Sequence, residues 1–199
     1  MMKLKSLVFT LAAVTLLTGC GAKVNPSQNT APQSAVPQVA KAWNSDGVIS
    51  DGEYKTKKMI GEIEVSTKVE GDSVLVGMKA RTTGWMSLGI DPEDKMKGAD
   101  IWMAFVKDGK AEVIDMYSTG PMGPHPADEK QGGKGDITMV SGTLQDGNTI
   151  IEFKRKLDTS DSKDKPLKIG ENKVMWGVGD SNDPSMKHSR RGYGTLELK

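Results

Sequence analysis

The sequence has little of the material from which most enzyme sites are built. Cysteine occurs once in 199 residues, as Cys20, so no intramolecular disulfide can form. Histidine occurs twice, as His125 and His188. The chain has no CxxCH motif for haem attachment, no zinc-type Cys/His cluster, no nucleotide-binding glycine loop and no nucleophile elbow. We therefore expect a protein that is not an enzyme in its own right.

The chain also lacks an excess of either charge. It contains 27 Lys and Arg residues against 26 Asp and Glu residues. Such a balance offers no electrostatic attraction to nucleic acid and no polybasic patch for a membrane surface. We expect no nucleic-acid partner.

Only one long apolar run is present, and it lies at the N-terminus. Residues 7–17 are largely apolar and follow a short basic start. Spanning a bilayer takes about 20 residues, so this run indicates a secretory signal peptide. The sequence Leu17-Thr18-Gly19-Cys20 resembles the lipobox of bacterial lipoproteins, in which the cysteine carries the lipid. We predict a signal peptide over residues 1–19 and a lipid on Cys20, which would anchor the chain to the extracytoplasmic face of the cell membrane.

The residues that follow the cysteine lack large apolar side chains. Residues 20–43 are rich in Pro, Ser, Gln, Asn and Ala. A segment of this composition cannot bury a core, so we predict a disordered linker. Residues 44–199 are then long enough for one folded domain.

The predicted domain shows no sustained helical pattern of apolar residues. Apolar and polar residues alternate instead, as in β-strands. Short alternating segments bounded by Gly, Asp, Asn and Pro recur at residues 63–69, 74–80, 86–90, 101–105, 111–117, 137–144, 149–155, 174–178 and 193–198. Many short strands at this spacing are typical of an antiparallel β-sandwich or barrel. We predict an all-β fold.

Methionine, by contrast, is abundant, with 12 residues. We expect those at inward-facing strand positions to fill the core, because Met adapts to irregular gaps; they are Met78, Met86, Met103, Met139 and Met175. Packing does not explain three methionines in polar loops, Met96, Met122 and Met186. A Met thioether and a His imidazole form an axial pair for haem iron, and the same donors suit Cu(I).

Met96 and His188 are the residues on which a site would depend. Met96 lies in the charged loop DPEDKMKG, and His188 lies in the loop sequence KHSRRG before the final strand. His125 stands between two prolines, where we expect an ordinary exposed loop histidine.

Residues 44–199 resemble a DOMON domain, the module named after dopamine β-monooxygenase. The resemblance rests on the order of several motifs: DGVISDGEY, GWMSLGI, KMKGADIWMAF, VIDMYSTGPMGPHPAD, TIIEFKRKLDTSD and VMWGVGD followed by KHSRRGYGTLEL. The resemblance implies an immunoglobulin-like antiparallel β-sandwich.

Within the same superfamily, the cytochrome domain of cellobiose dehydrogenase holds a non-covalent haem b. Its axial methionine and histidine correspond to Met96 and His188. For such a site we expect Trp85, Met86 and Trp102 to wall the porphyrin with apolar surface, and Lys187, Arg190 or Arg191 to pair with the propionates. Two strong axial ligands leave no open position on iron, so the implied role is electron transfer to a redox partner protein or a membrane oxidoreductase.

Two other functions are open at this point. A haem-free module could bind a sugar or another small ligand through Trp85, Trp102 and Asp100. A copper-handling protein could bind Cu(I) through the soft donors Met96, Met122, Met186 and His188.

Overall fold

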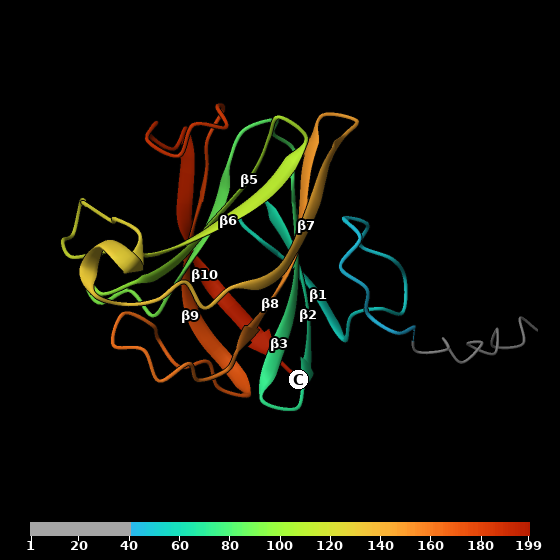
Figure 1. Ribbon diagram of the computed structural model, residues 1–199, viewed down its shortest axis with the longest axis horizontal. Coiled ribbons are helices and arrows are strands. Elements are labelled where there is room, and N and C mark those ends of the chain that lie inside the picture. The colour runs from blue at the N-terminus through green and yellow to red at the C-terminus, as the bar shows by residue number, and fades with distance from the viewer. Residues whose placement is uncertain (1–40) are drawn as a thin grey trace, which may run out of the picture. The chain divides into compact units, whose positions relative to one another are not determined.

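Residues 41–199 are described by a computed structural model (Figure 1). The predicted signal peptide, the lipidated Cys20 and most of the predicted linker lie outside the described residues. Contacts begin at the end of that linker, because Lys41 N donates to Gly52 O at 3.0 Å and Trp43 Nε1 donates to Tyr54 Oη at 2.8 Å. Within residues 41–199, no helix combines the length and apolar character needed to cross a membrane.

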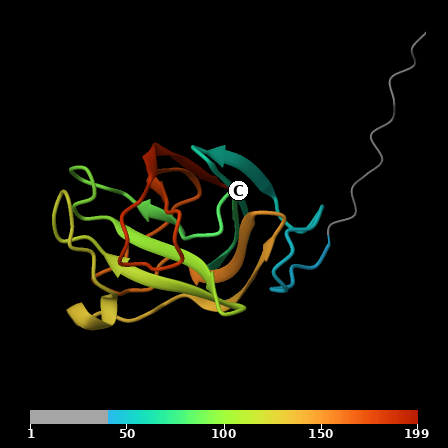
Figure 2. The same ribbon diagram turned by 90° about the horizontal axis from the view of Figure 1, so that it is seen from above.

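The described chain forms two antiparallel five-stranded sheets that pack face to face (Figures 1 and 2). The first sheet has the order β1 (Thr56–Ile60), β2 (Ile63–Glu70), β3 (Ser73–Ala80), β8 (Asn148–Lys156) and β7 (Thr138–Gln145). The second has the order β10 (Arg190–Leu198), β9 (Gly170–Val178), β4 (Met86–Ile90), β5 (Asp100–Lys107) and β6 (Lys110–Tyr117). One 3₁₀ turn, η1 (Asp128–Gln131), follows β6. The predicted all-β sandwich is confirmed.

The main core fills the space between the two sheets. It takes alternate residues from each inner face, which include Val65, Val76, Met78, Met86, Leu88, Trp102, Ala104, Ile151, Phe153, Val174 and Val178. Burial of these side chains is the main force that holds the sheets together.

A second apolar cluster lies on the outer face of the second sheet. It is centred on β5, where Ile101, Met103 and Phe105 point away from the main core and are no more than 3% exposed. Trp85 and Met116 complete this cluster. Strand β5 is therefore buried on both faces, whereas an antiparallel sheet commonly exposes one of its faces to solvent. The outer face of this sheet is the apolar surface on which the candidate site is built.

Two local predictions were wrong. Met139 was expected in the core but is 57% exposed, because a β-bulge between Thr138 and Ser141 gives it a positive φ of 53° and turns its side chain outward. Strand β1 was not predicted, since its only buried residue is Ile60 and its sequence shows no alternation. Met78, Met86 and Met103 are buried as expected.

Candidate functional site

Met96 and His188 lie on loops that leave opposite ends of the same pair of strands. Met96 lies in the loop between β4 and β5, whereas His188 lies in the loop between β9 and β10. Strands β4 and β9 are antiparallel neighbours, with Ile90 opposite Val174 and Met86 opposite Val178. The Met96 loop and the His188 loop therefore begin at opposite ends of this strand pair. They can approach each other only if they extend along the sheet toward its middle.

The Met96 loop is fastened to the long loop that follows β6. Met96 N donates to Pro121 O at 3.4 Å, and Gly98 N donates to Ser118 O at 2.8 Å. A methyl group built on Gly123 would lie 3.9 Å from Met96 Cε and 3.9 Å from His125 Cδ2. The half-buried side chains of Met96 and His125 therefore flank Gly123.

His188 is also half-buried, and its surroundings favour the neutral imidazole. Burial lowers the pKa of His188, and the positive charges of Arg191 and His125 lower it further. His188 Nε2 lies 3.4 Å from Arg191 Nη1. A neutral imidazole keeps the lone pair that a metal ion requires.

Three glycines in and just after β4 and β9 leave space on the outer side of the sheet, and the side chains of Met175 and Trp85 fill this space. Gly89 and Gly177 occupy the outer face of β4 and β9, where a Cβ on Gly89 would lie 2.5 Å from Met175 Cε. A Cβ on Gly179 would lie 2.5 Å from the Trp85 ring, and one on Gly177 would lie 3.4 Å from it. Trp85 and Met175 therefore form an apolar floor, so Trp85 lies on the expected side of the sheet.

Trp102 lies elsewhere, in the interior of the sandwich. It is fully buried, with its ring centroid 5.4 Å from that of Phe153 and 5.5 Å from Arg155 Cζ. Successive strand residues face opposite sides, so Trp102 points inward while Ile101 and Met103 point outward. This geometry does not allow Trp102 to wall a group bound beside Met96 and His188.

Arg190 likewise turns away from His188. Its Nε lies 2.7 Å from Glu62 Oε2, and its Nη1 lies 3.3 Å from Asp180 Oδ1. Arg190 and Arg191 are consecutive in β10, so their side chains point to opposite faces of the sheet. Arg191 pairs with Gly177 of β9, which lies on the outer face. Arg191 is therefore the basic side chain next to the site.

The residues of the two alternative functions differ in their exposure. Asp100 and Trp102 have no exposed surface, so they cannot meet a sugar at the surface. Met122 and Met186 are 80% and 56% exposed in their loops. A cavity of about 470 Å³ is lined by Lys41, Glu53, Tyr54 and their neighbours, and it shares no residue with the Met96 and His188 region.

Several known proteins are similar to this chain in sequence. MOXD1 homolog 1 of Drosophila melanogaster is 30% identical over 115 residues, which cover 57% of this chain and 16% of that protein. DBH-like monooxygenase protein 1 of Mus musculus is 29% identical over 132 residues, which cover 65% of this chain and 21% of that protein. The match thus spans about a fifth of the length of these relatives.

Among solved structures, the cytochrome domain of Myriococcum thermophilum cellobiose dehydrogenase has a similar fold. The TM-score is 0.50 at 12% identity, with 69% of this chain and 75% of that chain covered. A likeness at this identity concerns the fold alone. The family model described as DOMON domain matches residues 59–179, which include nine of the ten strands wholly or in part. The chain belongs to the DOMON domain family.

Proposed function

We propose that this chain is a lipid-anchored haem b protein that transfers electrons outside the cytoplasmic membrane. Met96 and His188 would be the axial ligands of the iron. The observation that supports the proposal is their placement: Met96 and His188 lie on loops at opposite ends of the strand pair β4 and β9, and the outer face of this pair carries Trp85 and Met175. A thioether and an imidazole are two donor types that hold a low-spin haem iron at both axial positions.

The surrounding residues suit a group of this kind. Met175, which is half-buried and packs against the cluster that contains Trp85, would contact the flat apolar face, and the exposed Arg191 would pair with a propionate. Bound haem would supply a one-electron couple. Met96 and His188 would both hold the iron, and the role of the protein would be that of an electron carrier.

Lipid attachment at Cys20 and the linker over residues 20–43 would define where this carrier works. A flexible tether lets a domain search a limited volume above the membrane. The partner would be a membrane oxidoreductase or another extracytoplasmic redox protein.

A second candidate function is Cu(I) binding, and His125 is the observation that favours it. His125 and Met96 flank Gly123, and the charge of His125 contributes to the lowered pKa of His188. One thioether and two imidazoles are a donor set that suits Cu(I). This set differs from the sequence-based one, since it replaces Met122 and Met186 with His125.

The two candidates are separated by titration of the purified full chain with haem and, in parallel, with Cu(I). Under the haem proposal, the reduced protein shows sharp low-spin bands. Met96→Ala and His188→Ala lose these bands or become high-spin. Met139→Ala is the matched control, because Met139 is exposed on the first sheet and should leave the spectrum unchanged. The haem proposal is wrong if the parent takes up no haem, or if both site variants keep the parent spectrum.

A further inference from the structure

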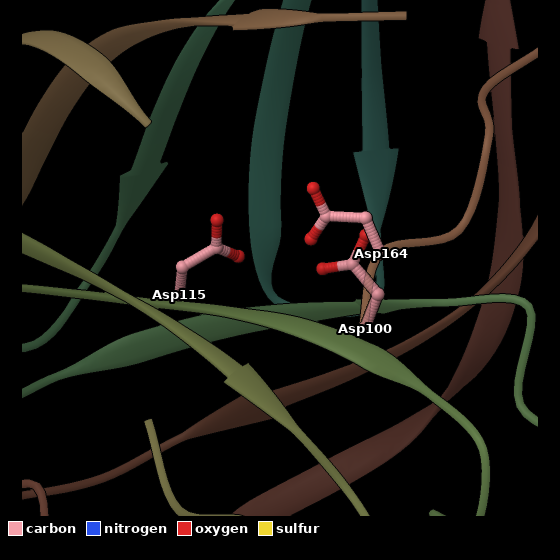
Figure 3. A group of neighbouring side chains, drawn as sticks. All are labelled: Asp100, Asp115 and Asp164. Carbon is pink, nitrogen blue, oxygen red and sulfur yellow. The ribbon is translucent and has the colours of Figure 1, made fainter. Parts of the chain in front are cut away.

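Three aspartates that are distant in sequence meet inside the sandwich (Figure 3). Asp100 begins β5, Asp115 lies near the end of β6, and Asp164 lies in the loop between β8 and β9. One carboxylate oxygen from each lies within 4.8 Å of the others. The residues are 0%, 3% and 8% exposed, respectively. Figure 3 shows the Asp100 and Asp164 carboxylates side by side, with Asp115 facing them.

Asp100 and Asp115 each use one oxygen and leave the other free, whereas neither oxygen of Asp164 has a hydrogen-bond partner within residues 41–199. Asp100 Oδ2 accepts hydrogen bonds from Arg155 Nη2 at 2.7 Å and Lys165 N at 3.0 Å. Asp115 Oδ2 accepts one from Asp136 N at 3.0 Å, and Asp164 Oδ2 lies 3.2 Å from Arg155 Nη2. The three Oδ1 atoms are buried and have no hydrogen-bond partner within residues 41–199.

Asp128 is a further buried carboxylate that has no hydrogen-bond partner among the described residues. It lies in η1, has no exposed surface, and neither of its carboxylate oxygens has a partner within the described part of the chain. Burial raises the pKa of Asp128 to about 8, and the charges of Asp115 and Asp164 contribute. A buried polar atom normally has a partner, so two such oxygens on one side chain require an explanation.

The charge in this region is not balanced by the protein. Asp100 and Asp164 share one guanidinium, that of Arg155, so the group of Asp100, Asp115 and Asp164 has an excess of two negative charges when all three are ionised. An ionised carboxylate is costly to bury unless it is paired or coordinates a metal. Either protons or a cation must therefore neutralise this region.

We propose that Asp100, Asp115 and Asp164 bind one calcium ion, and that Asp128 is a fourth carboxylate whose charge this ion neutralises. All the free donor atoms are carboxylate oxygens, which suit a hard cation and not a soft one. Oxygens on opposite sides of Ca²⁺ are about 5 Å apart, in agreement with the 4.8 Å limit for the first three residues. Mg²⁺ fits less well, because it usually keeps several waters and this site is buried.

The calcium site would join the loops that carry Met96 and His125. Asp100 directly follows Ala99, whose oxygen accepts from Ser118 N at 3.0 Å and whose nitrogen donates to Met96 O at 3.1 Å. Asp128 lies three residues after His125. The ion would thus hold both loops, and its binding does not depend on haem.

The test uses the full chain without haem, first stripped with EGTA and then titrated with CaCl₂. We expect one calcium per chain by elemental analysis after gel filtration. At a hundredfold excess over Kd, the midpoint of thermal unfolding should rise by roughly 5–10 °C. Asp128→Asn removes one carboxylate without changing its shape, and it should weaken Ca²⁺ binding at least about tenfold. Asp108→Asn, in an exposed turn, should bind as the parent does.

A spectroscopic readout keeps the test independent of stability. Terbium replaces calcium in oxygen sites and emits when a nearby tryptophan is excited, and Trp102 lies against Arg155 at the edge of this site. We expect emission that Ca²⁺ competes away in the parent and in Asp108→Asn, but that is weakened in Asp128→Asn. The proposal is wrong if Ca²⁺ neither binds nor shifts unfolding, which would leave protons as the neutralising species. It is also wrong if Asp128→Asn binds as the parent does, or if Mg²⁺ acts at the same concentration as Ca²⁺.

Discussion

Arg155 Nη2 lies 2.7 Å from Asp100 Oδ2, and neither side chain has any exposed surface. Arg155 comes from β8 of the first sheet and Asp100 from β5 of the second, so this ion pair crosses the core. Trp102, two residues after Asp100, packs against the same guanidinium. The contact therefore ties the two sheets together at the end where the Met96 loop begins.

Removal of Arg155 should be strongly destabilising. Arg155→Leu leaves Asp100 and Asp164 without their only basic partner in the structure described, at a cost of about 3–5 kcal/mol in the free energy of unfolding. Urea denaturation measures this loss. Arg190→Leu is the control, because its ion pair with Glu62 is partly exposed and should be worth at most about 1 kcal/mol. Equal losses in the two variants would show that the buried pair has no special role.

The stability of the calcium-free protein should fall as pH rises from about 4 to 8. Burial raises the pKa of Asp115 and of Asp128 to about 8 each, while the unfolded chain releases these protons near pH 4. The folded state then holds more protons than the unfolded state in this window, so the free energy of unfolding decreases with pH.

Chemical denaturation in EGTA at pH 5, 6, 7 and 8 measures this slope, and we expect a decrease of at most about 1.4 kcal/mol per pH unit for each of the two carboxyls. The other charged groups that act on these two carboxyls are Asp100, Glu129, Asp161, Asp164 and Arg155. The double variant Asp115→Asn/Asp128→Asn should flatten the profile. A stability that rises over this range would contradict the expected protonation of the buried carboxyls.

Gly61 should tolerate substitution less well than Gly71, although both have a positive φ. Their φ values are 59° and 63°, so alanine meets similar backbone strain at both, about 1 kcal/mol. A Cβ on Gly61 would clash with the Trp176 ring, whereas a Cβ on Gly71 has nothing within 4 Å. Gly61→Ala should therefore lower the thermal midpoint clearly more than Gly71→Ala. Equal shifts would mean that the Trp176 ring moves without cost.

His125→Ala should separate the two candidate functions of the Met96 and His188 region. If Met96 and His188 hold haem, this variant keeps low-spin bands, because neither axial ligand is lost. If the region binds Cu(I) through three soft donors, the same change should weaken binding at least about tenfold. Absorption spectra and competition with a Cu(I) chelator give the two readouts. A variant that loses low-spin haem would make His125 a ligand in place of His188 or Met96.

The strands and their family were open to prediction from the sequence because alternation and turn residues are local signals. Residues 63–69 and 149–155 alternate, and the structure places β2 and β8 there. Strand β1 was missed because it buries only one residue, and the exposure of Met139 depends on a bulge that leaves no pattern in the sequence. Local periodicity thus determined that the fold is all-β, and motif order determined the family.

The direction of each β5 side chain was decided only by the tertiary structure. Apolar residues occupy both faces of β5, so alternation cannot tell which face meets the other sheet. Trp102 is for that reason in the interior, while Ile101 and Met103 support the outer cluster. The same holds for the four buried aspartates and for His125. These residues come from separate strands and loops. In the sequence each of them is an ordinary polar position, and only the folding of the chain brings the three aspartates Asp100, Asp115 and Asp164 together.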